Sequence, residues 1–188
     1  GLNIIHRSGQ HLADLIEGLL DISKIEAGRL DLYRNRVQLP DLLEQLANMF
    51  SMQAKNKGIH FNFVVNGRLP NVVMTDEKRL RQILINLLSN AVKYTQDGEV
   101  NFEVSYRSQV AEFKIIDTGS GIDEEHLSRI FDPFERVRNL QTPNVQGTGL
   151  GLTIVKLLTE IMGGELTVES ELGKGSCFKA CLMLPWVN

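Results

Sequence analysis

Residues 76–94 have the sequence DEKRLRQILINLLSNAVKY. Apolar residues recur at intervals of three and four, which predicts a helix with one buried face, made of Leu80, Ile83, Leu84, Leu87, Leu88 and Ala91. Thr75 is a suitable N-cap, and Asp76 and Glu77 place negative charge in the first turn, where the helix dipole favours it. We expect the fold to be organised around a helix from Asp76 to Tyr94.

The opposite face of this helix carries Gln82, Asn86, Asn90 and Lys93. Asparagine is a mediocre helix former, so two of them one turn apart are an unusual choice for a solvated face. Their amide groups offer neutral carbonyl oxygens, hard ligands that suit Mg²⁺ and leave the negative charge to the phosphates of a nucleotide. Taken alone, the pattern also fits a polar face that happens to be rich in asparagine.

The composition fits one globular domain with a small attachment, since the 188 residues are 43% hydrophobic and 23% charged. A formal net charge of −3 and the lack of a basic run argue against nucleic-acid binding. No apolar stretch has membrane-spanning length, and the N-terminus does not resemble a signal peptide. Cys177 and Cys181 are expected to be core or half-buried thiols rather than metal ligands, which fits a cytoplasmic, reducing setting.

The first part of the chain, residues 1–28, is predicted to be one long helix that ends at Gly28. Its apolar residues follow heptad spacing and form a narrow seam at Ile5, Leu12, Leu15, Leu19 and Ile22. Such a seam needs a partner helix. Packing against the chain's own globular domain is one possibility, and the terminal position favours the other, a contact in a helical bundle or dimer.

The rest of the chain mixes both periodicities. Helices are predicted at 39–57, 123–130 and 148–162, and strands at 31–38, 59–65, 100–106, 110–116, 165–170 and 176–184. Residues 70–74 are expected to be a short extended link, and 131–146 a mobile loop. Adjacent hairpins rather than strict strand–helix alternation favour an α/β fold with a mixed sheet and helices on one face.

Two glycine-containing stretches are candidates for ligand binding. Asp117 ends a predicted strand, and Gly119 and Gly121 after it allow a backbone to approach a planar ligand, whose amino group can donate to the carboxylate. A plain Asp-Gly turn explains this pattern equally well. The stretch 147–152, GTGLGL, opens a helix and exposes N–H groups that suit phosphate oxygens, although tight packing explains it too.

Two further stretches have simpler explanations beside the functional ones. Residues 131–134, FDPF, can clamp the base of a lid or serve as hydrophobic anchors. Residues 173–176, GKGS, can line a pocket or form only a hairpin turn.

In their order, these segments resemble the catalytic and ATP-binding domain of a sensor histidine kinase. That domain belongs to the ATPase group that includes DNA gyrase, a mismatch-repair ATPase and a heat-shock chaperone. The resemblance rests on an N box at 86–95, glycine boxes at 117–122, 147–152 and 173–176, and an F box at 131–134. In addition, residues 20–28, LDISKIEAG, resemble the end of the dimerisation and phosphotransfer helices of hybrid kinases.

The resemblance implies a Bergerat-type two-layer sandwich over 31–188, preceded by the second dimerisation helix over 1–30. It implies that Asn90 and Asn86 hold Mg²⁺ and that Lys93 contacts phosphate, with Gln82, Asn86 and Lys93 as the catalytic group. Asp117 would bind the adenine amino group of ATP. Other residues expected along the nucleotide are Tyr94, Gly119, Gly121, Ile122, Phe131, Gly147, Thr148, Gly149, Leu150, Gly151, Leu152 and Ser176, with residues about 132–146 as the lid.

One departure from the family concerns the phosphoacceptor. The family places its acceptor in a His-Glu/Asp-x-x-Thr/Asn-Pro segment, and His6, His11, His60 and His126 all lack those neighbours. We therefore expect the acceptor histidine to lie outside this chain. The implied partners are the kinase's own dimerisation and phosphotransfer domain, as a homodimer in a full-length protein that can be membrane-anchored, and a response regulator or receiver domain.

Two other functions remain open on the sequence alone. A serine kinase or ATP-driven clamp of the same ATPase group is one, and the LDISKIEAG ending argues against it. A nucleotide-sensing module without catalysis is the other, and the intact Asn86, Asn90 and Asp117 argue against that.

Overall fold

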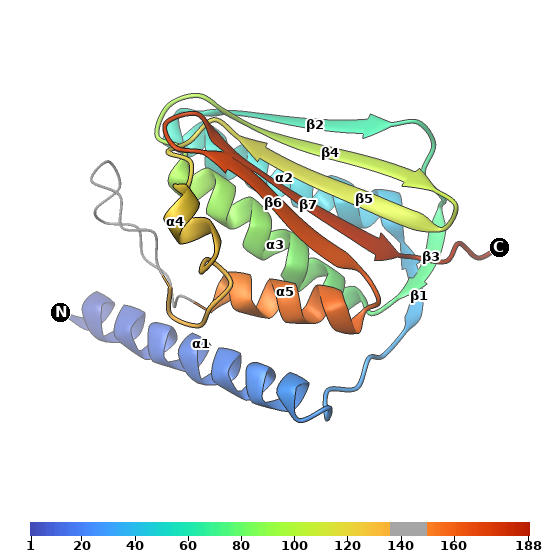
Figure 1. Cartoon of the computed structure of the whole chain (residues 1–188), viewed down its shortest axis with the longest axis horizontal. Helices are drawn as coiled ribbons and strands as arrows, with labels where there is room; N and C mark the ends of the chain where they lie inside the picture. Colours follow the sequence, from blue (N-terminus) through green and yellow to red (C-terminus); the bar gives the residue numbers. More distant parts are fainter. Residues whose placement is uncertain (136–149) are drawn as a thin grey trace.

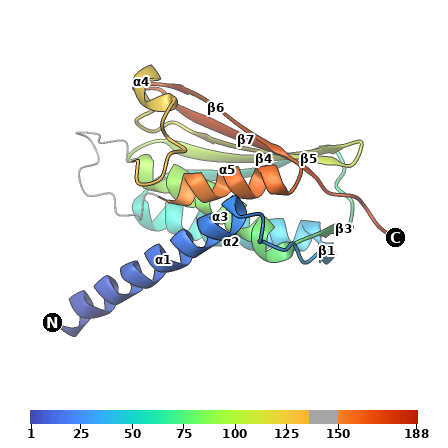
Figure 2. The same ribbon diagram turned by 60° about the horizontal axis from the view of Figure 1, so that its bottom comes forward.

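The computed structural model describes residues 1–135 and 150–188. Its main body is a mixed sheet with helices packed on one face, as the sequence predicts (Figures 1 and 2). The helices are α1 (Leu2–Glu26), α2 (Leu39–Lys57), α3 (Glu77–Tyr94), α4 (Glu124–Leu127) and α5 (Gly151–Ile161). The strands are β1 (Asn35–Gln38), β2 (His60–Asn66), β3 (Val72–Thr75), β4 (Glu99–Arg107), β5 (Val110–Asp117), β6 (Glu165–Glu171) and β7 (Gly175–Met183).

The large sheet has the strand order β2-β4-β5-β7-β6. β2 runs parallel to β4, with α3 in the connection between them, and the other neighbours are antiparallel. β5 alternates strictly between buried and half-buried residues, because one face of the sheet lies on the helices. Phe102 and Phe113 of the central strands fill this interface and are fully buried.

α3 lies at the centre of the helical layer, and its predicted apolar face is buried throughout. The helix begins one residue later than predicted, because the N-cap is Asp76 and not Thr75. Oδ1 of Asp76 accepts a hydrogen bond from the backbone N–H of Arg79 at 3.2 Å. Thr75 is the last residue of β3 and pairs with Asn35. Aspartate is at least as good an N-cap as threonine, so local chemistry explains the shift.

The predicted link at residues 70–74 contains a strand. β3 pairs with β1 in a separate two-stranded antiparallel sheet, and Val73 also bridges to Trp186 near the C-terminus. The link has too little alternation to predict this pairing, which depends on segments far apart in the sequence.

α4 is shorter than the predicted helix at 123–130. Asp123 caps it by accepting the N–H of His126 at 2.8 Å, and only Glu124–Leu127 is helical. α4 buries none of its own residues, so nothing favours further turns. Most of the predicted loop at 131–146, and the start of the predicted helix at 148–162, lie outside the described residues.

α1 packs on the chain's own domain over its last turns, which is one of the two expectations for its seam, and the contact in a helical bundle or dimer stays a prediction. Its last turns are anchored, with Gly18, Asp21 and Ile22 buried and Gly18 packed against Leu150 beside α5. Towards its N-terminus the helix leaves the body (Figure 2), and Ile5 and Leu12 are 70% and 56% exposed. Among the described residues, no helix combines the length and apolarity needed to cross a bilayer.

Candidate functional site

A cleft of about 970 Å³ lies between α1, α3 and α5. Gln82, Asn86 and Lys93 line it from α3, and Gly151 lines it from the first turn of α5. The structure therefore brings the three residues predicted to be catalytic to one hollow, together with one glycine of the GTGLGL stretch. α1 forms the third wall and contributes His11, among other residues.

The first turn of α5 lies directly against the amide of Asn86. A Cβ atom on Gly151 would lie 3.2 Å from Oδ1 of Asn86, a tighter contact than side chains normally make. A glycine at this position lets the α5 N-terminus approach the amide. Leu150, just before it, is 1% exposed and belongs to the core, while Leu152 is half-buried. Gly147, Thr148 and Gly149 lie outside the described residues.

Asp117 ends β5 and is almost completely buried, with 7% of its surface exposed. Its Oδ1 accepts the backbone N–H of Gly119 at 2.9 Å. Burial raises the pKa of this carboxyl from 3.8 to about 6, and hydrogen bonds from the backbones of Gly119 and Ser176 oppose the rise. A buried carboxylate with a perturbed pKa is typical of a binding site. Burying its charge lowers the stability of the folded protein, and a hydrogen bond from a ligand can offset that loss.

The turn after Asp117 packs against the C-terminal end of α3. A Cβ atom on Gly119 would collide with the carbonyl oxygen of Tyr94, and Ser120 donates its backbone N–H to that oxygen at 3.3 Å. Gly121 has a φ of +68°, and a Cβ there would collide with the carbonyl oxygen of Glu171. Both glycines are therefore required by close backbone contacts, which fix Asp117 relative to the end of α3.

A hydroxyl that the sequence did not single out joins this turn to β7. Oγ of Ser170 accepts the N–H of Ile122 at 2.7 Å and lies 2.8 Å from Oγ of Ser176. Ser176 is opposite Asp117 in the β5–β7 pair. Ile122 is 9% exposed and packs in the core, and its contact with the nucleotide stays a prediction.

Phe131, the first residue of the F box, contacts α5. Its carbonyl oxygen accepts the hydroxyl of Thr153 at 2.7 Å, and the ammonium of Lys156 lies 4.9 Å from the centre of its ring. The chain is therefore held on α5 shortly before the segment 136–149, which lies outside the described residues.

A family model described as "Histidine kinase-, DNA gyrase B-, and HSP90-like ATPase" matches residues 75–185, more than half of the chain. The chain belongs to this ATPase family.

Relatives and solved structures place it within the family, as an ATPase catalytic domain of the two-component sensor histidine kinase type. It is 38% identical over 188 residues to the aerobic respiration control sensor protein ArcB of Escherichia coli, covering 99% of this chain and 24% of ArcB. It is 40% identical over 183 residues to the autoinducer 2 sensor kinase/phosphatase LuxQ of Vibrio vulnificus, covering 94% of this chain and 21% of LuxQ.

The fold agrees with this placement. A crystal structure of full-length ShkA in complex with AMPPNP superposes with a TM-score of 0.86 at 34% identity, over 98% of this chain and 38% of ShkA. The catalytic domain of the histidine kinase ThkA superposes with a TM-score of 0.67 at 25% identity, over 80% of this chain and 97% of that domain. The chain spans between 9% and 24% of the length of the curated kinases named hybrid kinase B, LuxQ and ArcB.

The donor set of this histidine-kinase-type ATPase domain fits a magnesium ion shared with an anionic ligand. Asn86 and Asn90 are half-buried and one turn apart on the polar face of α3. Within residues 1–135 and 150–188, no group of three or more His, Cys, Asp or Glu side chains could hold a metal. Neutral amide oxygens are hard donors, and Mg²⁺ commonly takes few protein ligands and shares its charge with substrate phosphates.

Lys57 contacts the C-terminal end of α3 from outside the cleft, and no pattern in the sequence predicted this contact. Its ammonium donates to the carbonyl oxygens of Val92 at 2.7 Å and Lys93 at 2.8 Å. Burial lowers the pKa of Lys57. A cation at a helix C-terminus satisfies free carbonyls and interacts favourably with the dipole. Lys57 therefore holds the end of α3 that carries Lys93 and Tyr94 in this ATPase domain.

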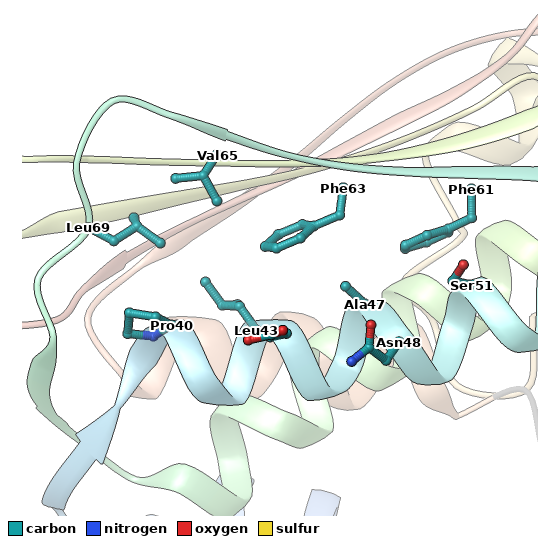
Figure 3. A pocket seen from close by; sticks show the side chains of 10 residues that line it. Pro40, Leu43, Ala47, Asn48, Ser51, Phe61, Phe63, Val65 and Leu69 are labelled. Carbon is teal, nitrogen blue, oxygen red and sulfur yellow. The ribbon is translucent and has the colours of Figure 1, made fainter.

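A second hollow, of about 440 Å³, lies between α2 and β2. Phe61 and Phe63 of β2 point onto α2 there, opposite Leu43 and Ala47 (Figure 3). None of the residues predicted for the nucleotide lines it. It is a surface groove of the domain, separate from the candidate site.

Proposed function

We propose that this chain binds Mg²⁺–ATP and transfers its γ-phosphoryl group to a histidine outside the chain, as part of a two-component sensor histidine kinase in the cytoplasm. The observation that carries this proposal is the cleft in which Gln82, Asn86 and Lys93 meet the N-terminus of α5. The backbone contact between Gly119 and Tyr94 links that cleft to the buried Asp117.

Asp117 is proposed to accept a hydrogen bond from the adenine amino group. Its Oδ1 already accepts the N–H of Gly119, and burial makes any further donor valuable to the ionised form. Gly119 and Gly121 would serve the site by letting the turn pack closely on the backbones of Tyr94 and Glu171, which fixes the position of Asp117. The sugar and base would then lie near Tyr94, and the phosphates would extend along α3 towards Asn86.

The phosphate end depends on four groups. Asn90 and Asn86 would hold Mg²⁺, which neutralises charge on the triphosphate when bound. Lys93 would contact phosphate, and the N–H groups at the start of α5, with the glycines before it, suit phosphate oxygens. Gln82 would donate to an oxygen of the group in transfer. In phosphoryl transfer the protein's contribution is mainly position and electrostatic stabilisation, and this set supplies both.

The acceptor is proposed to be a histidine of a dimerisation and phosphotransfer domain whose second helix is residues 1–30, with 31–188 as the catalytic domain. His11 lines the cleft, but Gln10 and Leu12 beside it provide no acid to orient and activate an imidazole. A homodimer and a downstream response regulator or receiver domain complete the proposed route of the phosphoryl group.

The test is incubation of the chain with radiolabelled ATP, Mg²⁺ and an acceptor-histidine domain in trans, followed by detection of acid-labile phosphate. We expect label on the acceptor domain, no label on His6 or His11, and loss of label in Asn90→Ala. Calorimetry that finds no nucleotide binding at millimolar concentration would contradict the proposed function. Binding without transfer would instead support a nucleotide-sensing module, and robust label on His6 or His11 would show that the acceptor is misplaced.

A further inference from the structure

A buried polar connection joins α1 to the candidate catalytic face through Arg79. Nη1 of Arg79, on α3, donates to Oε1 of Gln82 at 2.9 Å. The same nitrogen lies 3.5 Å from Oδ2 of Asp21, on α1, and the side chains of Arg79 and Asp21 are each only 11% exposed. One guanidinium thus contacts both the anchored end of α1 and a residue of the cleft.

The chemistry of arginine fixes how the Gln82 amide is turned. A guanidinium is only a donor, so the atom of Gln82 that faces it must be the oxygen. Because the oxygen of the Gln82 amide is directed at Arg79, its NH₂ group is available to donate into the cleft that Gln82 lines. A glutamine without this contact presents either end, since the two orientations have the same shape.

The position of Arg79 depends in turn on α1. Asp21 is buried, and its carboxylate compensates the charge of Arg79 away from water. The segment after α1 is held at the same place, because Oδ2 of Asp76 accepts the backbone N–H of Tyr33 at 3.0 Å. Displacing α1 would remove Asp21 and leave the guanidinium free to turn towards solvent.

We propose that Arg79 is a positioning residue that presents the NH₂ group of Gln82 to the reacting phosphoryl group only while α1 is docked through Asp21. The position of α1 then controls the rate of transfer rather than the affinity for nucleotide. This inference rests on the proposed phosphoryl transfer. Under it, movement of α1 changes the site through the contacts from Asp21 to Arg79 and from Arg79 to Gln82.

The test is a double-mutant cycle on the transfer rate at saturating Mg²⁺–ATP, with the acceptor domain in trans. Gln82→Met should slow transfer roughly a hundredfold, the loss typical of removing one preorganised donor to a reacting oxygen. Arg79→Met should slow transfer roughly tenfold or more, since misplacing the amide of Gln82 lowers the rate by at least about that factor. The double variant should be no slower than Gln82→Met, because Arg79 acts through Gln82.

Three further measurements separate positioning from a structural role. Nucleotide affinity should change less than about twofold in each variant, since Asp117 and Asn86 are untouched. Gln82→Glu keeps the acceptor for Arg79 but has no N–H, so it should be as slow as Gln82→Met. Lys114→Met removes a surface ion pair of similar length, 3.5 Å to Glu112, and should transfer at the wild-type rate.

If Arg79→Met does not fold, Asp21→Asn replaces it in the double-mutant cycle with Gln82→Met, because this substitution keeps the shape of the side chain. Absence of transfer by the unaltered chain would overturn the proposed function itself. If the unaltered chain transfers phosphate, additive losses in either cycle, or a fall in affinity that matches the fall in rate, would overturn the role of Arg79.

Discussion

The two ends of the candidate site are built in opposite ways. At the end proposed for adenine, Asp117 is buried in a turn whose glycines touch the backbones of α3 and of β6. At the end proposed for the phosphates, Gln82, Asn86 and Lys93 line an open cleft, and one wall of that cleft is α1, whose buried residues all lie in its last turns. In the proposed site, the fold of the sheet and α3 alone would fix the group that recognises the base, whereas transfer would depend on the position of α1.

The largest effect is expected where the adenine end is most tightly packed. Gly121→Ala should destabilise the protein by about 3 kcal/mol, because a collision with the carbonyl oxygen of Glu171 adds to the strain of a positive φ. Gly67→Ala is the matched control, since Gly67 has a φ of +85° and a Cβ atom added there would meet nothing within 4 Å. It should cost only about 1 kcal/mol. Chemical denaturation measures both, and equal losses would contradict the packing of this turn.

Asp117→Asn should separate stability from binding. It should weaken ATP binding by roughly 1.5–3 kcal/mol, the value of a hydrogen bond to a charged group. At pH 7 the nucleotide-free protein should become more stable, because burial penalises the ionised carboxylate, whose pKa is raised to about 6. Calorimetry and thermal unfolding test the two effects. Equal weakening of ATP and GTP analogues would argue against contact with the adenine amino group.

The raised pKa of Asp117 predicts a pH dependence for each property. Between about 4 and 6 the folded protein binds more protons than the unfolded chain, so the stability of the nucleotide-free protein should fall as the pH rises through this window. ATP affinity should change the other way. It should fall roughly tenfold for each pH unit below the folded pKa, because the protonated carboxyl is a weaker acceptor. Asp117→Asn should lack this step, and an unchanged step would assign it to another group.

A smaller effect is expected at the end of α3 that lies between the two halves of the site. Lys57→Met removes the two hydrogen bonds to the carbonyls of Val92 and Lys93 and should cost about 1 kcal/mol of stability. Lys55→Met removes an exposed lysine from the same turn of α2 and serves as the control. Urea titration compares them, and indistinguishable midpoints would mean that Lys57 contributes nothing as a cap.

Local patterns in the sequence predicted the features that depend on neighbours along the chain. The spacing of apolar residues located α2, α3 and the strands of the large sheet, and the polar face of α3 located Gln82, Asn86 and Lys93. The exceptions are short elements, such as β3 and α4, in which few residues carry the pattern. At the N-cap of α3, two adjacent residues were both suitable, and local spacing does not choose between Thr75 and Asp76.

The contacts that position the site could not be predicted in the same way, because they join residues far apart in the sequence. Lys57 bonds to a carbonyl 35 residues away, Ser170 to an N–H 48 residues away, and Asp21 to an arginine 58 residues away. In the sequence each is an ordinary polar residue of a helix or strand. Only the fold shows which of them is buried and what it faces.

The small β1–β3 sheet has a mechanical consequence. β1 is the first strand after α1, β3 leads directly into the N-cap of α3, and the two are paired over four residues from Asn35 to Gln38. On its other side β3 is held by the C-terminal segment, with Met74 donating to Pro185 at 2.8 Å and Val187 donating to Val72 at 3.0 Å. A pulling force on α1 therefore acts on β3, the strand that continues into α3. Because the C-terminal segment holds β3 on its other side, the force is concentrated at the start of α3, the helix that carries the candidate catalytic face.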